Sequence, residues 1–133
     1  MADGFPLEGM ELTHILVSKD TANARDFYVR VLGAELYREY GSSIVLRFLG
    51  NWLLLVEGGE PTKDKPTVTF APPSDPNTVS HSFTIRVPDC RAAYETLHER
   101  GAEFLTAPVD WGGEVRCFLR DPDGHLFELS QAT

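Results

Sequence analysis

The chain has 133 residues, of which 42% are hydrophobic and 24% are charged, and its formal net charge is −8. This length fits one domain over residues 1–133, and the apolar content predicts a packed protein rather than a disordered one. So acidic a chain has no basic stripe to neutralise phosphates, which excludes nucleic acid and anionic membranes as partners. No apolar run approaches the roughly 20 residues of a membrane helix, and no signal-peptide pattern opens the chain, so we expect a cytoplasmic protein.

The first half of the chain, residues 10–57, predicts a strand, a helix and three further strands. Leu12–Ser18 is apolar and β-branched, and Asp20 after it is a good helix N-cap. Apolar residues then recur at helical spacing until Gly33, which ends the helix. The three further strands are predicted at residues 34–40, 43–48 and 52–56.

Residues 58–79 are rich in Gly, Pro, Lys and Asp and predict a linker between the two halves. A linker of about 20 residues is long for a compact domain, so we expect it to cover the cavity or the partner subunit. Within it, residues 67–71 alternate like a short strand and are expected to pair at a sheet edge.

The second half, residues 80–131, repeats the same order of elements. A strand over Ser82–Val87 leads to Asp89, a second helix N-cap, and the helical stripe ends at Gly101. The tripeptide Gly-Ala-Glu follows both predicted helices. The last strands are predicted at residues 115–119 and 126–129, joined by the turn at residues 121–124. This internal duplication predicts an α+β fold of two tandem βαβββ modules, whose curved mixed sheets surround a cavity.

These residues resemble the vicinal oxygen chelate superfamily, which includes glyoxalase I, bleomycin-binding proteins, fosfomycin-resistance enzymes and extradiol dioxygenases. The resemblance rests on Asp20, Phe27-Tyr28, Leu32-Gly33, Val87, Asp89, Tyr94, Gly101, Arg120-Asp121-Pro122-Asp123-Gly124 and Glu128-Leu129. It covers the chain from about Leu12 to Leu129 and implies an acidic cytosolic homodimer with a small-molecule cavity. Because the superfamily shares a fold and not a reaction, function has to be inferred from the site.

The metal enzymes of this superfamily take their ligands from the first and last strands of each module, which implies four positions to test. In the first strand, alternation predicts that Ile15 and Val17 pack under the helix. His14 and Leu16 then face the cavity, which makes His14 a candidate metal ligand. The spacing from His14 to Asp20 is one residue shorter than the usual family pattern, which leaves this assignment open.

Glu128 matches the ligand position of the last strand, where alternation turns its carboxylate toward the cavity. Leu54 takes the equivalent place in the first module and cannot bind a metal. His81 lies on the core side of its strand and reaches the cavity only through a β-bulge, so it is the weaker third candidate. The simpler alternatives are a backbone hydrogen bond for His14 and an ion pair with Arg116 for Glu128.

The rest of the cavity is predicted to be apolar and aromatic, with a few polar groups that orient a ligand. The predicted ligand-binding residues are Leu16, Arg47, Trp52, Leu54, Ser82, Thr84, Trp111, Arg116 and Leu126. Trp111 precedes two glycines on a segment that could cover the site. The alternatives are packing of both tryptophans between modules or subunits, and solvent exposure of both arginines at sheet edges. The two cysteines, Cys90 and Cys117, show no metal or redox spacing and are interpreted as structural.

Two classes of function follow from these residues. The first is sequestration of a small organic molecule in a largely apolar cavity with an incomplete metal site. The second is a divalent-metal-dependent lyase, isomerase or dioxygenase that uses His14 and Glu128, with a third ligand from His81 or the partner subunit. Its ion would be Mn²⁺, Fe²⁺, Zn²⁺ or Ni²⁺. The missing ligands favour the first class, and neither class identifies a catalytic residue.

Overall fold

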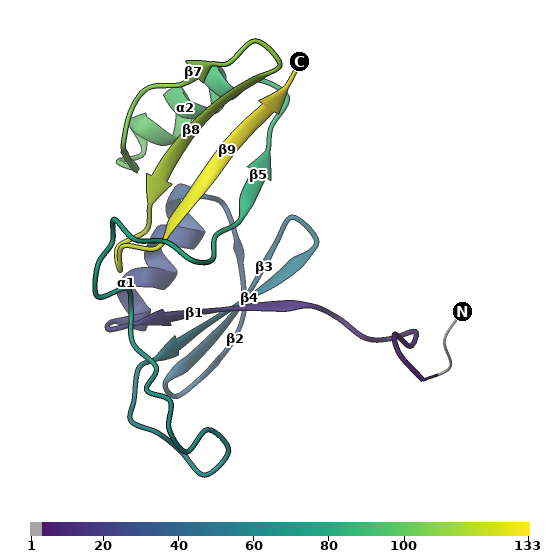
Figure 1. Ribbon diagram of the computed structural model, residues 1–133, viewed down its shortest axis with the longest axis vertical. Helices are drawn as coiled ribbons and strands as arrows, with labels where there is room; N and C mark the ends of the chain where they lie inside the picture. The colour runs from purple at the N-terminus through teal and green to yellow at the C-terminus, as the bar shows by residue number, and fades with distance from the viewer. Residues whose placement is uncertain (1–3) are drawn as a thin grey trace.

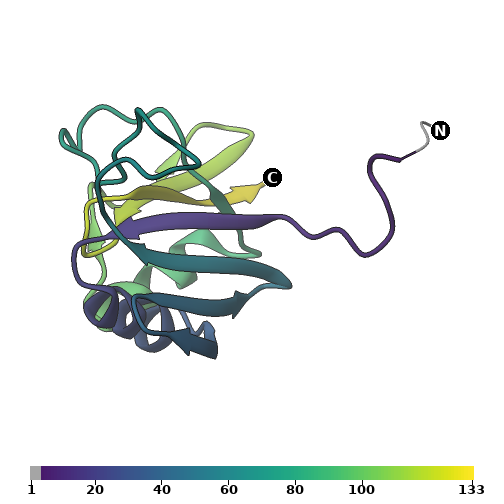
Figure 2. The same ribbon diagram turned by 90° about the horizontal axis from the view of Figure 1, so that it is seen from below.

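A computed structural model of the protein describes residues 4–133, so the first three residues of the predicted domain lie outside it. Two βαβββ modules follow one another along these residues, which confirms the predicted α+β fold. Figure 1 shows the two sheets one above the other, with the first helix near their junction. The segment before the first strand runs away from the rest of the chain in both views (Figures 1 and 2).

The first module forms a four-stranded sheet in the order β1-β4-β3-β2, in which β1 and β4 are parallel. Its elements are β1 (Thr13–Ser18), α1 (Thr21–Asp26), the π-helical segment η1 (Phe27–Val31), β2 (Glu35–Tyr40), β3 (Ser43–Phe48) and β4 (Asn51–Glu57). Asp20 caps α1 as predicted, because its carboxylate accepts a hydrogen bond from the backbone N–H of Asn23 at 3.1 Å. The chain then leaves the helix at Gly33, whose φ of 82° suits glycine.

The second module repeats this arrangement with the strand order β5-β9-β8-β6, while β7 also pairs with β8. Its elements are β5 (Thr84–Arg86), α2 (Cys90–Glu99), β6 (Glu103–Phe104), β7 (Val109–Asp110), β8 (Glu114–Arg120) and β9 (Leu126–Ala132). Asp89 caps α2 through the N–H of Ala92 at 3.0 Å. The strand predicted over Ser82–Val87 is shorter than expected, and the last strand is longer. The second strand of this module is divided into β6 and β7, and Pro108, which has no N–H to pair, precedes β7.

The segment between the modules folds back on itself without forming a regular strand. The strand predicted over residues 67–71 is wrong, because only an isolated bridge forms there, between Phe70 and Gly59. Gly58 allows this close approach, since a Cβ at that position would lie 2.6 Å from the backbone oxygen of Phe70. Local pairing therefore replaces the predicted edge pairing.

Each helix covers one face of its own sheet, and the two buried clusters meet at the junction of the modules. The side chains that pack against both clusters are Phe27, Leu32, Phe48 and Phe83. Aromatic stacking continues this contact, because the Phe83 and Phe127 ring centroids lie 4.7 Å apart. The two modules therefore share a continuous apolar core.

The hairpin between β8 and β9 is attached to the first module by buried hydrogen bonds. The Tyr28 hydroxyl donates to Asp121 Oδ2 at 2.8 Å, and Asp121 Oδ1 accepts the N–H groups of Asp123 and His125 at 2.9 and 3.0 Å. His125 Nε2 lies 2.8 Å from the backbone oxygen of Val17. Burial raises the pKa of the Asp121 carboxyl and raises that of the Tyr28 hydroxyl well above its usual value. The hairpin at residues 120–124, which carried part of the resemblance to the superfamily, therefore has a mainly structural role.

The two cysteines lie in the core of the second module, as their structural interpretation requires. Cys90 Sγ and Cys117 Sγ are 3.8 Å apart, and both thiols are free and buried. Burial raises the pKa of both thiols, that of Cys117 to about 12, so neither is activated as a nucleophile. No helix within residues 4–133 is both long and apolar enough to cross a membrane.

Candidate functional site

The first strand shows which side chains point away from the helix. Leu16 is only 8% exposed and packs in the core with Ala24 and Tyr28, whereas Ile15 is 51% exposed. The predicted alternation of this strand is therefore wrong by one residue. Thr13 and Ile15 lie on the side of the sheet that α1 leaves uncovered, and His14 and Leu16 lie on the helix side. The physical reason is that residues 15–17 are all apolar, so either register buries an apolar set.

The uncovered side of the first sheet, which we call the first open face, is apolar and aromatic. It contains a shallow hollow of about 250 Å³ lined by Glu11, Thr13, Tyr37, Tyr40, Val45, Trp52 and Leu54. Trp52 Nε1 donates a hydrogen bond to Glu11 Oε2 at 2.8 Å. The Arg47 guanidinium carbon lies 4.3 Å from the Trp52 ring centroid, and the Tyr37 ring meets Trp52 edge-on at 4.9 Å. Three predicted ligand-binding residues, Arg47, Trp52 and Leu54, are therefore brought together.

Glu11 and Tyr37 belong to this hollow although the sequence analysis did not select them. Tyr37 lies at a β-bulge, because the pairing of β2 with β3 shifts between Leu36 and Arg38. Glu11 precedes the first strand, and no local pattern links it to Trp52. Strand alternation alone therefore could not predict that Glu11 and Tyr37 line this hollow.

The uncovered side of the second sheet, the second open face, is polar. Thr84 Oγ1 donates to Glu128 Oε1 at 2.6 Å, and Arg116 Nε lies 3.9 Å from Glu128 Oε2. The Glu128 side chain is only 14% exposed, so this carboxylate is largely desolvated. The Arg116 guanidinium carbon lies 5.2 Å from the ring centroid of Trp111, which is 64% exposed. The ion pair named as the alternative role of Glu128 is therefore present.

A second carboxylate extends this polar face. Glu114 accepts a short hydrogen bond from the Ser130 hydroxyl and pairs with Arg116 at 3.3 Å and with Arg86 at 3.8 Å. The hydrogen bond from Ser130 is the main cause that lowers the pKa of Glu114, followed in effect by the arginine charges. The second open face therefore holds both signs of charge in a fixed arrangement.

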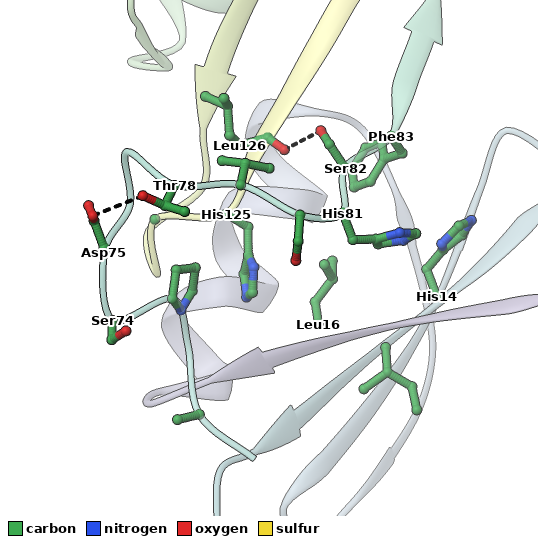
Figure 3. Close-up of a pocket in the computed structure, with 16 residues that line it drawn as sticks. His14, Leu16, Ser74, Asp75, Thr78, His81, Ser82, Phe83, His125 and Leu126 are labelled. Atoms are coloured by element: carbon green, nitrogen blue, oxygen red, sulfur yellow. Dashed lines mark hydrogen bonds between the residues drawn. The ribbon is translucent and has the colours of Figure 1, made fainter. Parts of the chain in front are cut away.

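A second hollow, the inter-module cavity, lies between β1, the linker and the hairpin before β9. It has a volume of about 570 Å³, and its walls include His14, Leu16, Asp75, Thr78, His81, Ser82, Phe83, His125 and Leu126. Figure 3 shows the rings of His14 and His81 side by side. Their centroids lie 6.0 Å apart. Ser82 Oγ donates to the backbone oxygen of Leu126 at 2.5 Å. Leu16, Ser82 and Leu126 thus gather here rather than on the open faces.

The superfamily implies a divalent metal, and the residues on the open faces do not fit it. In the parallel strand pairs, Leu54 lies opposite Ile15 and Glu128 lies opposite Thr84. Of these four paired positions on the open faces, only Glu128 has a side chain of a type that commonly binds a metal. His14 contacts His81 at the inter-module cavity, whereas Glu128 contacts Thr84 on the second open face. Within residues 4–133, no three His, Cys, Asp or Glu side chains converge closely enough to hold an ion. Within one chain, His14 and Glu128 therefore lie at different places, and their assignment as metal ligands stays a prediction.

Comparison with known proteins agrees with this architecture. The family model described as Glyoxalase/Bleomycin resistance protein/Dioxygenase superfamily matches residues 11–129. The chain is 29% identical to lactoylglutathione lyase of Pseudomonas aeruginosa, over 86% of this chain and 78% of that protein.

Two solved structures have the same fold at low sequence identity. A glyoxalase/bleomycin resistance protein/dioxygenase from Nocardioides is 21% identical with a TM-score of 0.74, covering 92% of this chain and 83% of its own. TioX from Micromonospora sp. ML1 is 24% identical with a TM-score of 0.72, covering 94% of this chain and 100% of its own. These similarities extend over both modules.

Proposed function

Because the chain belongs to the Glyoxalase/Bleomycin resistance protein/Dioxygenase superfamily, in which function depends on the site, we propose that it sequesters a small organic molecule. The proposed ligand is aromatic, carries a positive charge or is neutral, and binds at the first open face. The protein is proposed to act in the cytoplasm as a homodimer.

The arrangement around Trp52 is the observation that carries this proposal. Its indole is fixed by Glu11 and flanked by the Tyr37 ring, and Leu54 continues the apolar surface beside it. Aromatic rings attract flat apolar molecules and cations. The Glu11 carboxylate pairs with the Arg47 guanidinium at 3.6 Å, so this part of the face carries no net positive charge that would repel a cationic ligand. The chain's net charge of −8 also favours a cationic ligand over an anionic one.

The hollow on the first open face is incomplete in a single chain, which supports a dimeric site. Its volume of about 250 Å³ is below the range of about 300–1,000 Å³ typical of small-molecule sites. Large hydrophobic side chains around it, including Ile15, Tyr37 and Tyr40, are exposed. Exposed apolar patches mark binding surfaces, and we propose that the second open face of a partner chain covers this one. Thr84, Arg116 and Trp111 would then complete the ligand's surroundings.

The donor chemistry of the open faces supports binding without turnover. The place taken by Glu128 in the second module is taken by Leu54 in the first, so a paired chain adds no second carboxylate there. Glu128 already has Thr84 and Arg116 as partners. A carboxylate compensated in this way needs no metal ion to offset its burial.

A divalent-metal-dependent lyase is the second candidate. Two observations favour it: the largely buried Glu128 carboxylate, and the similarity to a lactoylglutathione lyase at 29% identity. In that case Glu128 would be one ligand of an ion that polarises the substrate's oxygens. The remaining ligands would have to come from residues other than Leu54 and Ile15.

The proposal is tested by titrating the protein with ethidium, an aromatic cation, and with 1-naphthol, a neutral aromatic, using calorimetry. We expect binding by the wild type, at least tenfold weaker binding by Trp52→Leu, and an unchanged affinity for Leu105→Ala, a control at an exposed loop leucine. Sedimentation should show a dimer. If neither probe binds, or if Trp52→Leu binds as tightly as the wild type, the proposed site is wrong. A stoichiometric metal ion in the purified protein that is lost in Glu128→Ala would favour the lyase.

A further inference from the structure

The inter-module cavity is more than twice as large as the hollow on the first open face, and the proposed function does not use it. Its volume of about 570 Å³ falls within the range of about 300–1,000 Å³ typical of small-molecule sites, whereas the other hollow has about 250 Å³. Its walls come from β1, from residues between 71 and 83 and from residues 124–126 of one chain. This cavity therefore reaches the size of a ligand site without a partner chain.

Hydrogen bonds hold the linker in place beside this cavity. The Arg120 guanidinium donates to the backbone oxygen of Pro76 at 2.7 Å and to the side-chain oxygen of Asn77 at 3.0 Å. The Asp75 carboxylate accepts hydrogen bonds from the Asn77 backbone N–H and the Thr78 hydroxyl, both at 3.0 Å. This wall is therefore ordered before a ligand binds, which limits the conformational entropy that binding costs.

Two histidines from different modules meet at the border of the cavity. His14 lies on β1 and His81 lies in the segment that leads into β5, and Figure 3 shows their rings side by side. The hydrogen bonds within residues 4–133 include none from either ring, whereas His125 Nε2 lies 2.8 Å from the backbone oxygen of Val17. A neutral imidazole has one donor nitrogen and one acceptor nitrogen. The two rings can therefore offer an N–H donor and a nitrogen acceptor to the same ligand.

The charges around the cavity favour an uncharged ligand. The described residues that line it include one carboxylate, Asp75, and neither lysine nor arginine. The hydrogen bonds from the Asn77 N–H and the Thr78 hydroxyl lower the pKa of the Asp75 carboxyl, so it stays ionised at neutral pH. An anionic ligand would meet this charge without a cation to bind it, and a cationic ligand would find both carboxylate oxygens already in use.

The inner wall of the cavity is apolar and contains an aromatic ring. Leu16 is almost fully buried, and Phe83 and Leu126 are half-buried beside it. The Phe83 ring centroid lies 6.1 Å from that of His14, so the apolar wall begins next to the two imidazoles. Aromatic rings favour flat partners. The cavity therefore suits a flat molecule with one polar edge.

We propose that the inter-module cavity binds a flat, uncharged cyclic amide, with its ring against Phe83 and its amide edge toward His14 and His81. A ring holds the amide cis, so its N–H donor and its carbonyl acceptor project from neighbouring atoms on one edge. One imidazole accepts a hydrogen bond from the amide N–H, and the other donates to the carbonyl oxygen. Hydrogen bonds of about 2.9 Å from neighbouring ligand atoms can reach two rings whose centroids lie 6.0 Å apart.

This site is separate from the one proposed for sequestration at the first open face. The residues that line the inter-module cavity and those that line the hollow around Trp52 have no member in common. The inference does not depend on a dimer, because one chain supplies every residue that it uses. Failure of either proposal therefore leaves the other intact.

The test is calorimetric titration of the full-length protein with oxindole, a flat cyclic amide, and with N-methyloxindole, which keeps the ring and the carbonyl but lacks the N–H donor. We expect the wild type to bind oxindole at least tenfold more tightly than N-methyloxindole. His14→Phe and His81→Phe, which keep a ring but remove its nitrogens, should each reduce this preference to less than threefold. His98→Phe changes an exposed histidine on α2, is the matched control, and should keep the preference.

The outcomes separate this site from the first open face. The inference is wrong if oxindole does not bind, if N-methyloxindole binds as tightly, or if both histidine variants keep the wild-type preference. It is also wrong if Trp52→Leu abolishes the preference, since the amide would then bind at the first open face. His81 is exposed, so His81→Phe should fold even if His14→Phe does not, and circular dichroism checks both.

Discussion

The two open faces occupy equivalent places in the two modules and differ in chemistry. Leu54 and Glu128 are equivalent by register, because each lies opposite a first-strand residue of its own module, Ile15 and Thr84 respectively. On the first face these positions are apolar, and on the second they carry a carboxylate and a hydroxyl. The duplicated backbone therefore fixes where side chains point but not what they do.

The covered faces differ much less. Leu55 and Leu129, which lie one residue further along, are both essentially buried and pack under α1 and α2. A buried leucine is required on this side of both sheets because each module has one helix to cover it. The contrast shows that packing constrains one side of each sheet, while the other side is free to diverge in function.

The largest expected loss of stability tests whether the helix-covered faces of the two sheets are packed alike. Leu55→Ala and Leu129→Ala should each lower the free energy of unfolding by about 2–5 kcal/mol, because each removes buried methyl groups and leaves a cavity. Leu54→Ala, on the first open face, should cost clearly less. Denaturant unfolding at neutral pH measures all three. A loss for Leu54→Ala as large as for Leu55→Ala would show that the first open face is packed like a core.

The next effect tests the polar contact that joins the modules. Tyr28→Phe removes the hydroxyl that donates to the buried Asp121 at 2.8 Å, leaving a carboxylate oxygen without its donor. The free energy of unfolding should fall by about 1–3 kcal/mol, the usual penalty for a buried group left unpaired. Tyr94→Phe on α2 is the control, since that side chain makes ring contacts with His98 and Phe104. Equal losses in the two variants would mean that the hydroxyl of Tyr28 contributes nothing specific.

The duplication and both helix caps could be predicted from the sequence because they depend on local rules. Asp20 and Asp89 accept the hydrogen bonds of the first helical turn, and any short polar side chain followed by an apolar stripe predicts that geometry. In β9 the alternation of Phe127, Glu128 and Leu129 contrasts apolar with charged residues. One register therefore buries a charge, and the correct register was identifiable.

The first strand lacked that contrast, which explains the error at Leu16. The spacing between His14 and Asp20 was the available signal for the register of this strand, because His14 stands one residue closer to Asp20 than the family pattern requires. That shift places Thr13 on the first open face and His14 on the other side. The meeting of His14 with His81 depends on how the modules pack and on the path of the linker, and no local pattern encodes either.

The smallest expected effect is a change in the pH dependence of stability. Burial raises the pKa of the Asp121 carboxyl in the folded chain above the unfolded value of about 3.9. Between these two pKa values the folded chain holds more protons than the unfolded chain, so this group makes the protein less stable as the pH rises through that window. The effect is absent below both values and complete above both.

Asp121→Asn removes this titration while its amide oxygen can still accept the N–H groups of Asp123 and His125. Glu114 contributes with the opposite sign, because its lowered pKa adds stability that is lost as the pH falls through its folded value. That contribution is common to the wild type and the variant and cancels in their difference. Denaturant unfolding between about pH 4 and about pH 8 should show the variant gaining stability relative to the wild type as the pH rises, then levelling off. A difference that is flat, or that falls with rising pH, would mean that hydrogen bonds outweigh desolvation at Asp121, and that the hairpin contact stabilises the ionised carboxylate.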